Sequence, residues 1–211
     1  HPVDRRQRQM CIRDRSMQTR WQNGAIAKRV VSPLTLIVSG FAPVQDARKT
    51  LTPVLQPQSD TVLVLLEFGL QRLGGSCLAQ VYGQLGDTAP DVEDAAAFKA
   101  MLTWLIDIKR QGLILALHDR SDGGLIVTLL EMVFASRMGL DIDIASSHNL
   151  ISALFNEEIG FVAQVKSAQL SELQASAPCA CIPIARLRED ERVVINHCLL
   201  YTSPSPRDSS K

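Results

Sequence analysis

The chain has 211 residues, of which 46% are hydrophobic and 21% charged, and its 22 basic side chains balance its 22 acidic ones. This composition is ordinary for a globular protein and excludes a largely disordered or collagen-like chain. No apolar run reaches the roughly 18 residues that a membrane span requires, and the first twenty residues lack the apolar core of a secretory signal. The five cysteines form no CxxC pair, which indicates a reduced, cytoplasmic protein without a zinc knuckle.

The neutral balance is the sum of two unlike parts. Residues 1–20 hold six arginines and two aspartates, a net charge of +4, so the rest of the chain carries −4. A basic arm on an acidic body is typical of a nucleic-acid-binding tail or of a segment foreign to the fold. Because residues 1–15 lack periodicity and residues 198–211 are rich in Ser and Pro, we expect both ends to be non-native or disordered. We therefore expect neither a nucleic-acid nor a membrane partner.

Strand and helix patterns alternate along the chain. Strands are predicted where short apolar runs lie between turn residues, at 34–41, 61–68, 113–117, 140–144, 160–165 and 181–185. Helices are predicted from apolar spacing and capping residues, at 77–85, 92–111, 124–137, 150–155 and 167–177. This order implies one layered sheet covered by helices.

The strongest local signal for chemistry is the segment HDRSDGG at 118–124. It lies between a buried strand and a helix N-terminus, where ligands of open α/β sheets bind and where unpaired N–H groups favour an anion. Asp119 could hold Mg²⁺ beside phosphates, Ser121 could contact a phosphate, and Asp122 could cap the helix. In the alternative interpretation, Ser121 and Asp122 are both caps and Asp119 pairs with Arg120.

The sequence offers three weaker candidates besides these residues. The adjacent carboxylates of NEEIG at 156–160 could contact a metal or a substrate amine, although such pairs more often form a solvated turn. The segment RLGGSC at 72–77 resembles a phosphate cradle, and its Cys77 could be a nucleophile whose pKa the helix lowers, or else a small buried cysteine. His118 could be a general base or a hydrogen-bonded structural histidine.

Five segments resemble the phosphoribosylformylglycinamidine synthase family, the large ATP-dependent amidotransferases of purine biosynthesis. They are residues 16–22 (SMQTRWQ), 32–55, 72–94 (RLGGSCLAQVYGQLGDTAPDVED), 118–125 (HDRSDGGL) and 154–160 (LFNEEIG). HDRSDGGL followed by FNEE is typical of the wider family of aminoimidazole-ribonucleotide-synthase-like C-terminal domains, and the longer segments narrow the resemblance to the synthase. The resemblance implies an α+β fold, a layered α/β/α sandwich whose mixed sheet has elements of ferredoxin-like topology.

The resemblance also implies a site and an activity. Asp119 would be a Mg²⁺ ligand and Ser121 a contact to ATP or ADP, at an auxiliary site whose nucleotide is held for structure, and no catalytic residue is implied. The full enzyme would be a carbon–nitrogen ligase that uses ATP and glutamine to convert formylglycinamide ribonucleotide to formylglycinamidine ribonucleotide.

The resemblance finally implies a division of the chain. We expect residues 16–31 to be the remnant of a preceding nucleotide-binding lobe, and residues 32–197 to be the C-terminal-type lobe. The family's glutaminase domain and preceding lobe have no counterpart in this sequence, so we expect a fragment that is inactive alone and whose partners are those missing parts. The alternative is a non-catalytic module of the same fold that binds ATP or ADP or another subunit.

Overall fold

The computed structural model describes residues 18–31, 39, 41–44, 46–144 and 149–195. The two predicted arms, 1–15 and 198–211, lie outside these residues. The chain divides into two compact units, His1–Ala47 and Arg48–Lys211. Among the described residues, no helix has the length and apolar character needed to cross a bilayer.

The first unit contains an antiparallel hairpin that the sequence analysis did not predict. Its strands are β1 (Gln18–Asn23) and β2 (Ile26–Val31). Asn23 pairs with Ile26, and Gly24 in the turn between them has a φ of +62°. This left-handed conformation is the one that short hairpin turns require and that glycine adopts without strain.

The second unit is built on a mixed sheet of six strands in the order β4-β6-β3-β7-β5-β8. The strands are β3 (Thr61–Glu67), β4 (Ala116–Asp119), β5 (Gly139–Ile142), β6 (Gly160–Lys166), β7 (Ala180–Arg188) and β8 (Val193–Ile195). Neighbouring strands are antiparallel except β5 and β8, which are parallel. The apolar strand β3 lies between β6 and β7, and its sequence TVLVLLE suits a strand that is covered on both faces.

The described residues also form the helices η1 (Ala47–Lys49), α2 (Cys77–Val81), α3 (Ala95–Arg110), α4 (Gly124–Ser136), α5 (Leu150–Phe155), η2 (Ser167–Gln169) and α6 (Leu170–Ser176). The helices α3, α4, α5 and α6 pack on this sheet, whereas η1 and α2 bury none of their residues. The longest, α3, is capped by Asp94, whose Oδ1 accepts the N–H groups of Ala96 and Ala97 at 2.9 Å each. It is followed by Gly112 with φ +73°, the usual glycine after a helix end.

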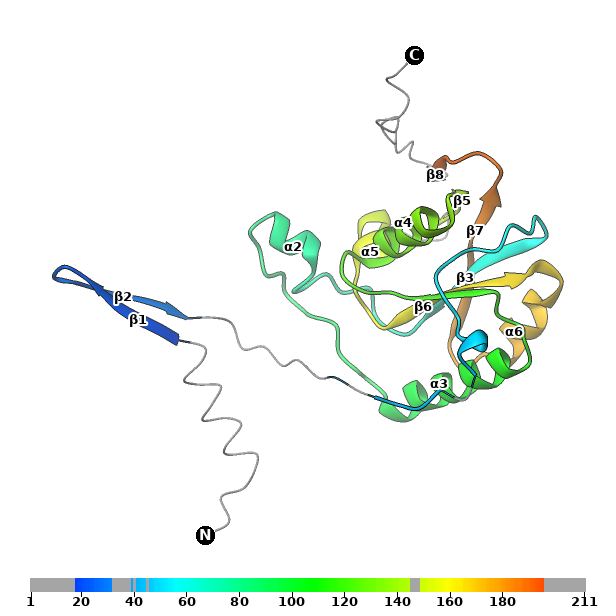
Figure 1. Ribbon diagram of the computed structural model, residues 1–211, viewed down its shortest axis with the longest axis horizontal. Coiled ribbons are helices and arrows are strands. Elements are labelled where there is room, and N and C mark those ends of the chain that lie inside the picture. Colours follow the sequence, from blue (N-terminus) through cyan, green and yellow to red (C-terminus); the bar gives the residue numbers. More distant parts are fainter. Residues whose placement is uncertain (1–17, 32–38, 40, 45, 145–148, 196–211) are drawn as a thin grey trace, which may run out of the picture. The chain divides into compact units, whose positions relative to one another are not determined.

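Alternate side chains of β3 enter two separate cores. Val62, Val64 and Leu66 pack with α3 and α6 on one face, and Leu63 and Leu65 pack with α4 and α5 on the other. Figure 1 shows these two pairs of helices on opposite sides of the sheet. The predicted fold class, α+β with helices on both faces of a mixed sheet, is therefore confirmed.

Several predicted elements differ from the structure in their bounds, and two of these differences have a visible cause. The strand predicted at 113–117 is β4, which begins only at Ala116, because the N–H of Leu113 donates to the carbonyl of Ile108 and continues the last turn of α3. The helix predicted at 77–85 ends at Val81, and Gly83 follows with φ +65°.

The strand predicted at 34–41 falls largely outside the described residues. Of its residues the structure describes Ser39 and Phe41, neither in a strand. The Phe41 side chain is 98% exposed.

Candidate functional site

The β4–α4 turn connects an edge strand to a buried helix. Asp119 ends β4, and Gly123, with φ +86°, is the residue before the first turn of α4. Gly124 has φ +75°, and a Cβ atom there would lie 2.7 Å from the carbonyl oxygen of Asn156. Glycine is therefore required at 124 both by the backbone conformation and by the close packing of this turn on the end of α5.

The carboxylate of Asp119 faces solvent, since 67% of its side chain is exposed. Its Oδ1 lies 3.2 Å from Nδ1 of His118, and Nε2 of His118 lies 2.9 Å from Oε2 of Glu131. His118 therefore has a hydrogen-bond partner at each ring nitrogen. An exposed carboxylate at the end of a strand offers the hard oxygen that Mg²⁺ prefers.

Arg120 points the other way, into the protein, so the interpretation in which it pairs with Asp119 is wrong. Its side chain is fully buried, with Nη1 3.1 Å from Oε1 of Glu67. It also donates to the carbonyls of Glu158 at 2.7 Å and Ile159 at 3.2 Å. Burial lowers the pKa of Arg120, and the charge of Glu67 opposes that shift. Arg120 thus fastens the turn to the ends of β3 and β6.

The carboxylate at the start of α4 belongs to Glu157. Its Oε1 accepts the N–H of Gly123 at 2.8 Å and also the N–H of Cys77, the first residue of α2, at 2.8 Å. The residue before α4 is Gly123, and in the described part of the chain neither Ser121 nor Asp122 has a side-chain hydrogen bond to the start of α4, so the predicted caps from Asp122 and Ser121 are wrong. The expectation of an unpaired N–H at this turn is also wrong for Gly123, because an internal carboxylate already accepts from it.

The neighbouring Glu158 holds the start of segment 72–77. Its side chain is fully buried, which contradicts the interpretation of 156–160 as a solvated turn. Oε1 of Glu158 accepts from the backbone N–H of Arg72 at 3.1 Å and from its Nε at 2.6 Å, and Oε2 accepts from Nη2 at 3.0 Å. Burial alone would raise the pKa of Glu158, but the hydrogen bonds from Arg72 outweigh it and lower the pKa.

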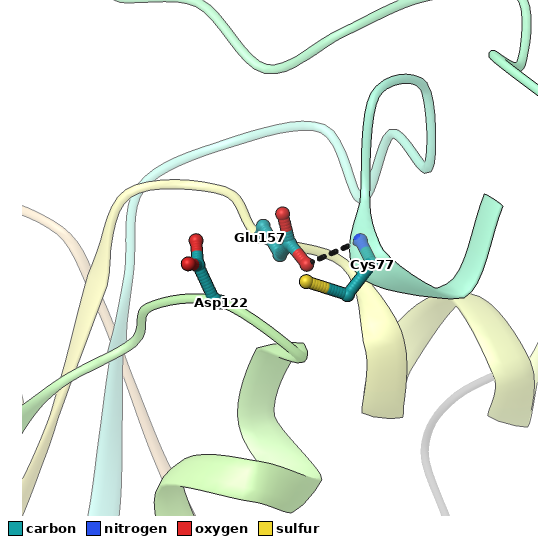
Figure 2. A group of neighbouring side chains, drawn as sticks. All are labelled: Cys77, Asp122 and Glu157. Carbon is teal, nitrogen blue, oxygen red and sulfur yellow. Dashed lines mark hydrogen bonds between the residues drawn. The ribbon is translucent and has the colours of Figure 1, made fainter. Parts of the chain in front are cut away.

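Cys77, Asp122 and Glu157 meet between these segments (Figure 2). Their sulfur and carboxylate atoms lie within 4.8 Å of one another, and they are the only such trio of His, Cys, Asp or Glu in the part of the chain that the structure describes. They could share a cation, but the two amide hydrogen bonds of Glu157 account for its position without one.

The surroundings of Cys77 do not activate its thiol. Burial raises the pKa of Cys77, and the hydrogen bond and charge of Glu157 and the charge of Asp122 raise it further. The expected lowering of this pKa by the helix is therefore wrong, and the thiol is a poor nucleophile.

Strand register explains why these distant segments meet. Glu67 at the end of β3 pairs with Gly160 at the start of β6, and Asp119 at the end of β4 pairs with Phe161. The segments that follow β3 and β4 and the segment that precedes β6 therefore share one edge of the sheet. The sequence marked each segment separately, but only this register shows that they form one site.

The family of the chain follows from the match of its second unit. The model of the family "AIR synthase related protein, C-terminal domain" matches residues 58–197, which include the whole six-stranded sheet and the segments described above. The chain belongs to this family.

Among solved structures, the fold is similar to several synthases from Thermotoga maritima. PurL complexed with ATP has 15% sequence identity over 75% of this chain and 27% of its own, with a TM-score of 0.56. PurLQS has 15% identity over 84% of this chain and 28% of its own, with a TM-score of 0.55. Phosphoribosylformylglycinamidine synthase II has 18% identity over 68% of this chain and 24% of its own, with a TM-score of 0.50.

These likenesses confirm the expected resemblance at the level of the fold. The chain spans about a quarter of the length of these structures.

Proposed function

We propose that this chain is an internal lobe of a phosphoribosylformylglycinamidine synthase and that its β4–α4 turn contributes to a Mg-nucleotide site. The observation that carries the proposal is the exposed carboxylate of Asp119 at the end of β4, within the segment HDRSDGGL. Solved relatives of this fold are described as complexes with ATP, AMPPCP and ADP. We infer the same class of ligand for this chain.

The donor set fits a magnesium ion that is shared with other groups. Asp119 supplies one exposed carboxylate, and it belongs to no trio of close metal-ligating side chains within the described residues. Mg²⁺ is commonly held by one or two carboxylates together with phosphate oxygens and water. Asp119 would therefore be one ligand, the nucleotide phosphates others, and the rest would come from outside this lobe.

Within the turn, each residue has a distinct task. Asp119 would present its carboxylate to the ion, and the hydroxyl of Ser121 would donate to a phosphate oxygen. Arg120 keeps the two neighbouring side chains facing outward, because its own side chain is buried against Glu67. A bound Mg²⁺ would neutralise phosphate charge. None of these residues is assigned a role in bond making or breaking.

The full enzyme would amidate formylglycinamide ribonucleotide. ATP would phosphorylate the amide oxygen of the substrate and leave as ADP. Ammonia released from glutamine would then attack the amide carbon, and phosphate would leave from that carbon, giving formylglycinamidine ribonucleotide. Residues 32–197 would form the lobe, residues 16–31 would end the preceding nucleotide-binding lobe, and residues 1–15 and 198–211 would not belong to the enzyme. The isolated chain is then expected to lack synthase activity.

An NMR titration of the ¹⁵N-labelled chain with Mg-ADP tests the nucleotide site. We expect Mg-ADP to shift the amide signals of residues 119–123, and Asp119→Ala to abolish these shifts, because the ion loses its ligand from this lobe. Asp60→Ala, which removes an exposed aspartate before the far end of β3, serves as the matched control and should respond like the wild type. Shifts that persist in Asp119→Ala, or that are absent from the wild type at millimolar nucleotide, would overturn the assignment. Equal shifts with ADP in the absence of Mg²⁺ would remove the role of the ion.

A further inference from the structure

Two consecutive glutamates hold the glycine-rich segment 72–77 at both of its ends. The buried carboxylate of Glu158 accepts three hydrogen bonds from Arg72. The carboxylate of Glu157 accepts the N–H of Cys77 at the other end. Because the two glutamates are neighbours in the turn before β6, any shift of that turn moves both ends of the segment.

The segment is also fixed between its ends. Ser76 is buried, and its hydroxyl donates to the carbonyl of Leu73 at 2.7 Å and accepts the N–H of Ala79 at 3.2 Å. A Cβ atom on Gly74 would lie 2.3 Å from the carbonyl oxygen of Thr88. The backbone of the segment therefore has little freedom to move away from this position.

One position in the segment leaves room for a ligand. Gly75 is exposed and has φ +71°, and the nearest atom to a Cβ built there would be the Cβ of Ala89 at 3.9 Å. A glycine with open space in front of it permits close approach of a ligand to the backbone. By contrast, the charge of Arg72 is already engaged by Glu158 and Glu93, the latter at 2.5 Å.

The link to the β4–α4 turn is a single oxygen atom. Oε1 of Glu157 accepts from Cys77 and from Gly123, each at 2.8 Å, and Gly123 lies two residues after Ser121. A carboxylate oxygen has two lone pairs and can therefore accept two amide hydrogen bonds at once. Glu157 thus fixes the distance between the two loops.

We propose that Glu157 is a positioning residue that joins segment 72–77 and the turn 119–124 into one nucleotide-binding surface. This inference rests on the proposed nucleotide site, and it adds a second wall to that site, with Gly75 as its point of closest approach to the ligand. The ligand is the Mg-nucleotide, and segment 72–77 would contact it by shape alone, since the N–H groups of Gly74, Gly75 and Ser76 already donate to the carbonyls of Thr88, Leu85 and Leu73.

Two NMR readouts of the full chain test this role, amide hydrogen exchange and the Mg-ADP titration. In Glu157→Ala we expect exchange at Cys77 and at Gly123 to accelerate together by at least about ten-fold, since both amides lose one acceptor. The Kd for Mg-ADP should rise at least about ten-fold, and the nucleotide-induced shifts at 74–76 should disappear. Glu157→Gln, whose amide oxygen can still accept both bonds, should restore both readouts in part.

Controls separate this role from general stability and from the proposed function. Glu172→Ala, an exposed glutamate on α6, should leave both readouts unchanged, and exchange in β3 should be the same in all folded variants. Asp119→Ala should abolish nucleotide binding without altering exchange at Cys77 or Gly123. If Glu157→Ala does not fold, the same two readouts are compared between Glu157→Gln and the wild type, and they decide whether Glu157 positions the two loops.

Three outcomes would overturn the inference. They are acceleration at only one of the two amides, wild-type affinity for Mg-ADP in Glu157→Ala, and absence of nucleotide-induced shifts at 74–76 in the wild type. If the wild type binds no Mg-ADP at all, both the proposed nucleotide site and its second wall are ruled out. The exchange data then still show whether Glu157 couples the two loops.

Discussion

Arg120 shows how one buried charge can set the direction of a whole turn. Its guanidinium is fully buried and bonded to Glu67 and to two carbonyl groups. Because Arg120 points inward, Asp119 before it is exposed and Ser121 after it is half-buried. The pattern D-R-S alone did not predict this, since an adjacent Asp and Arg are equally able to pair with each other.

Loss of this guanidinium should be costly. Arg120→Met would leave the Glu67 carboxylate without its cation, and removal of one partner of a buried pair costs about 3–5 kcal/mol of the free energy of unfolding. Arg110→Met, at a side chain that is 76% exposed, should cost less than about 1 kcal/mol. Urea denaturation of both variants measures the difference. Similar small costs for both variants would show that the Arg120 pair contributes little.

The lowered pKa of Glu158 predicts that the free energy of unfolding depends on pH. Its pKa is lower in the folded protein than in the unfolded chain, where the pKa of a glutamate is about 4.3. The folded state therefore binds fewer protons, and the stabilisation is complete above the unfolded pKa and is lost as the pH falls through the folded pKa. In Glu158→Gln the free energy of unfolding should be about 3 kcal/mol lower than wild type at pH 7.

That difference should shrink as the pH falls below about 4. Denaturant titrations of both proteins between neutral and acidic pH measure it. A gap that stays constant down to pH 3 would mean that the ion pair with Arg72 does not titrate with folding.

At the scale of elements, two glycines with the same backbone conformation should differ in their tolerance of a methyl group. Gly112 and Gly124 have φ of +73° and +75°, but a Cβ on Gly112 meets nothing within 4 Å. A Cβ on Gly124 would lie 2.7 to 2.8 Å from backbone atoms at the end of α5. We expect Gly112→Ala to cost about 1–2 kcal/mol, from conformational strain alone.

Gly124→Ala adds a clash with backbone atoms that cannot rotate away, so its cost should reach about 3 kcal/mol or more. Thermal and urea denaturation compare the two variants directly. Equal costs would show that the α4 N-terminus and the end of α5 do not pack as closely as the structure has them.

The elements also show where sequence patterns suffice. The apolar run TVLVLLE, the end of α3 before Gly112 and the helix at 150–155 were all predictable, because the signals are local. The start of β4 was misplaced, since it depends on whether Leu113 extends a helical turn or pairs with a strand. The hairpin β1–β2 was missed, and it has no long apolar run.

The residues of the site likewise fall into those that have a local sequence signal and those that have none. Asp119 and Ser121 were marked by a local motif at the end of a strand, which short-range reasoning can find. Glu157 as the acceptor at the start of α4 was not, because its place depends on the pairing of β4 with β6 and of β3 with β6. A residue 34 positions away cannot be chosen over the adjacent Asp122 from sequence spacing.

At the scale of the whole molecule, the chain holds one complete six-stranded sheet and about a quarter of the length of the solved synthases. Its site has one proposed metal ligand, Asp119, facing solvent at one edge of this sheet. Such a site needs further groups to enclose an ion and a nucleotide. The account therefore predicts that this lobe takes part in the synthase reaction only when it is joined to the rest of a synthase, although it can bind Mg-ADP alone.

The most direct measurement places residues 32–197 into a full-length phosphoribosylformylglycinamidine synthase in place of its own lobe, and assays glutamine- and ATP-dependent formation of formylglycinamidine ribonucleotide. The account predicts that the chimera is active and that Asp119→Ala in the chimera lowers the activity at least about ten-fold, while Asp60→Ala leaves it unchanged. A chimera that folds with the thermal stability of the parent enzyme but forms no product would contradict the account.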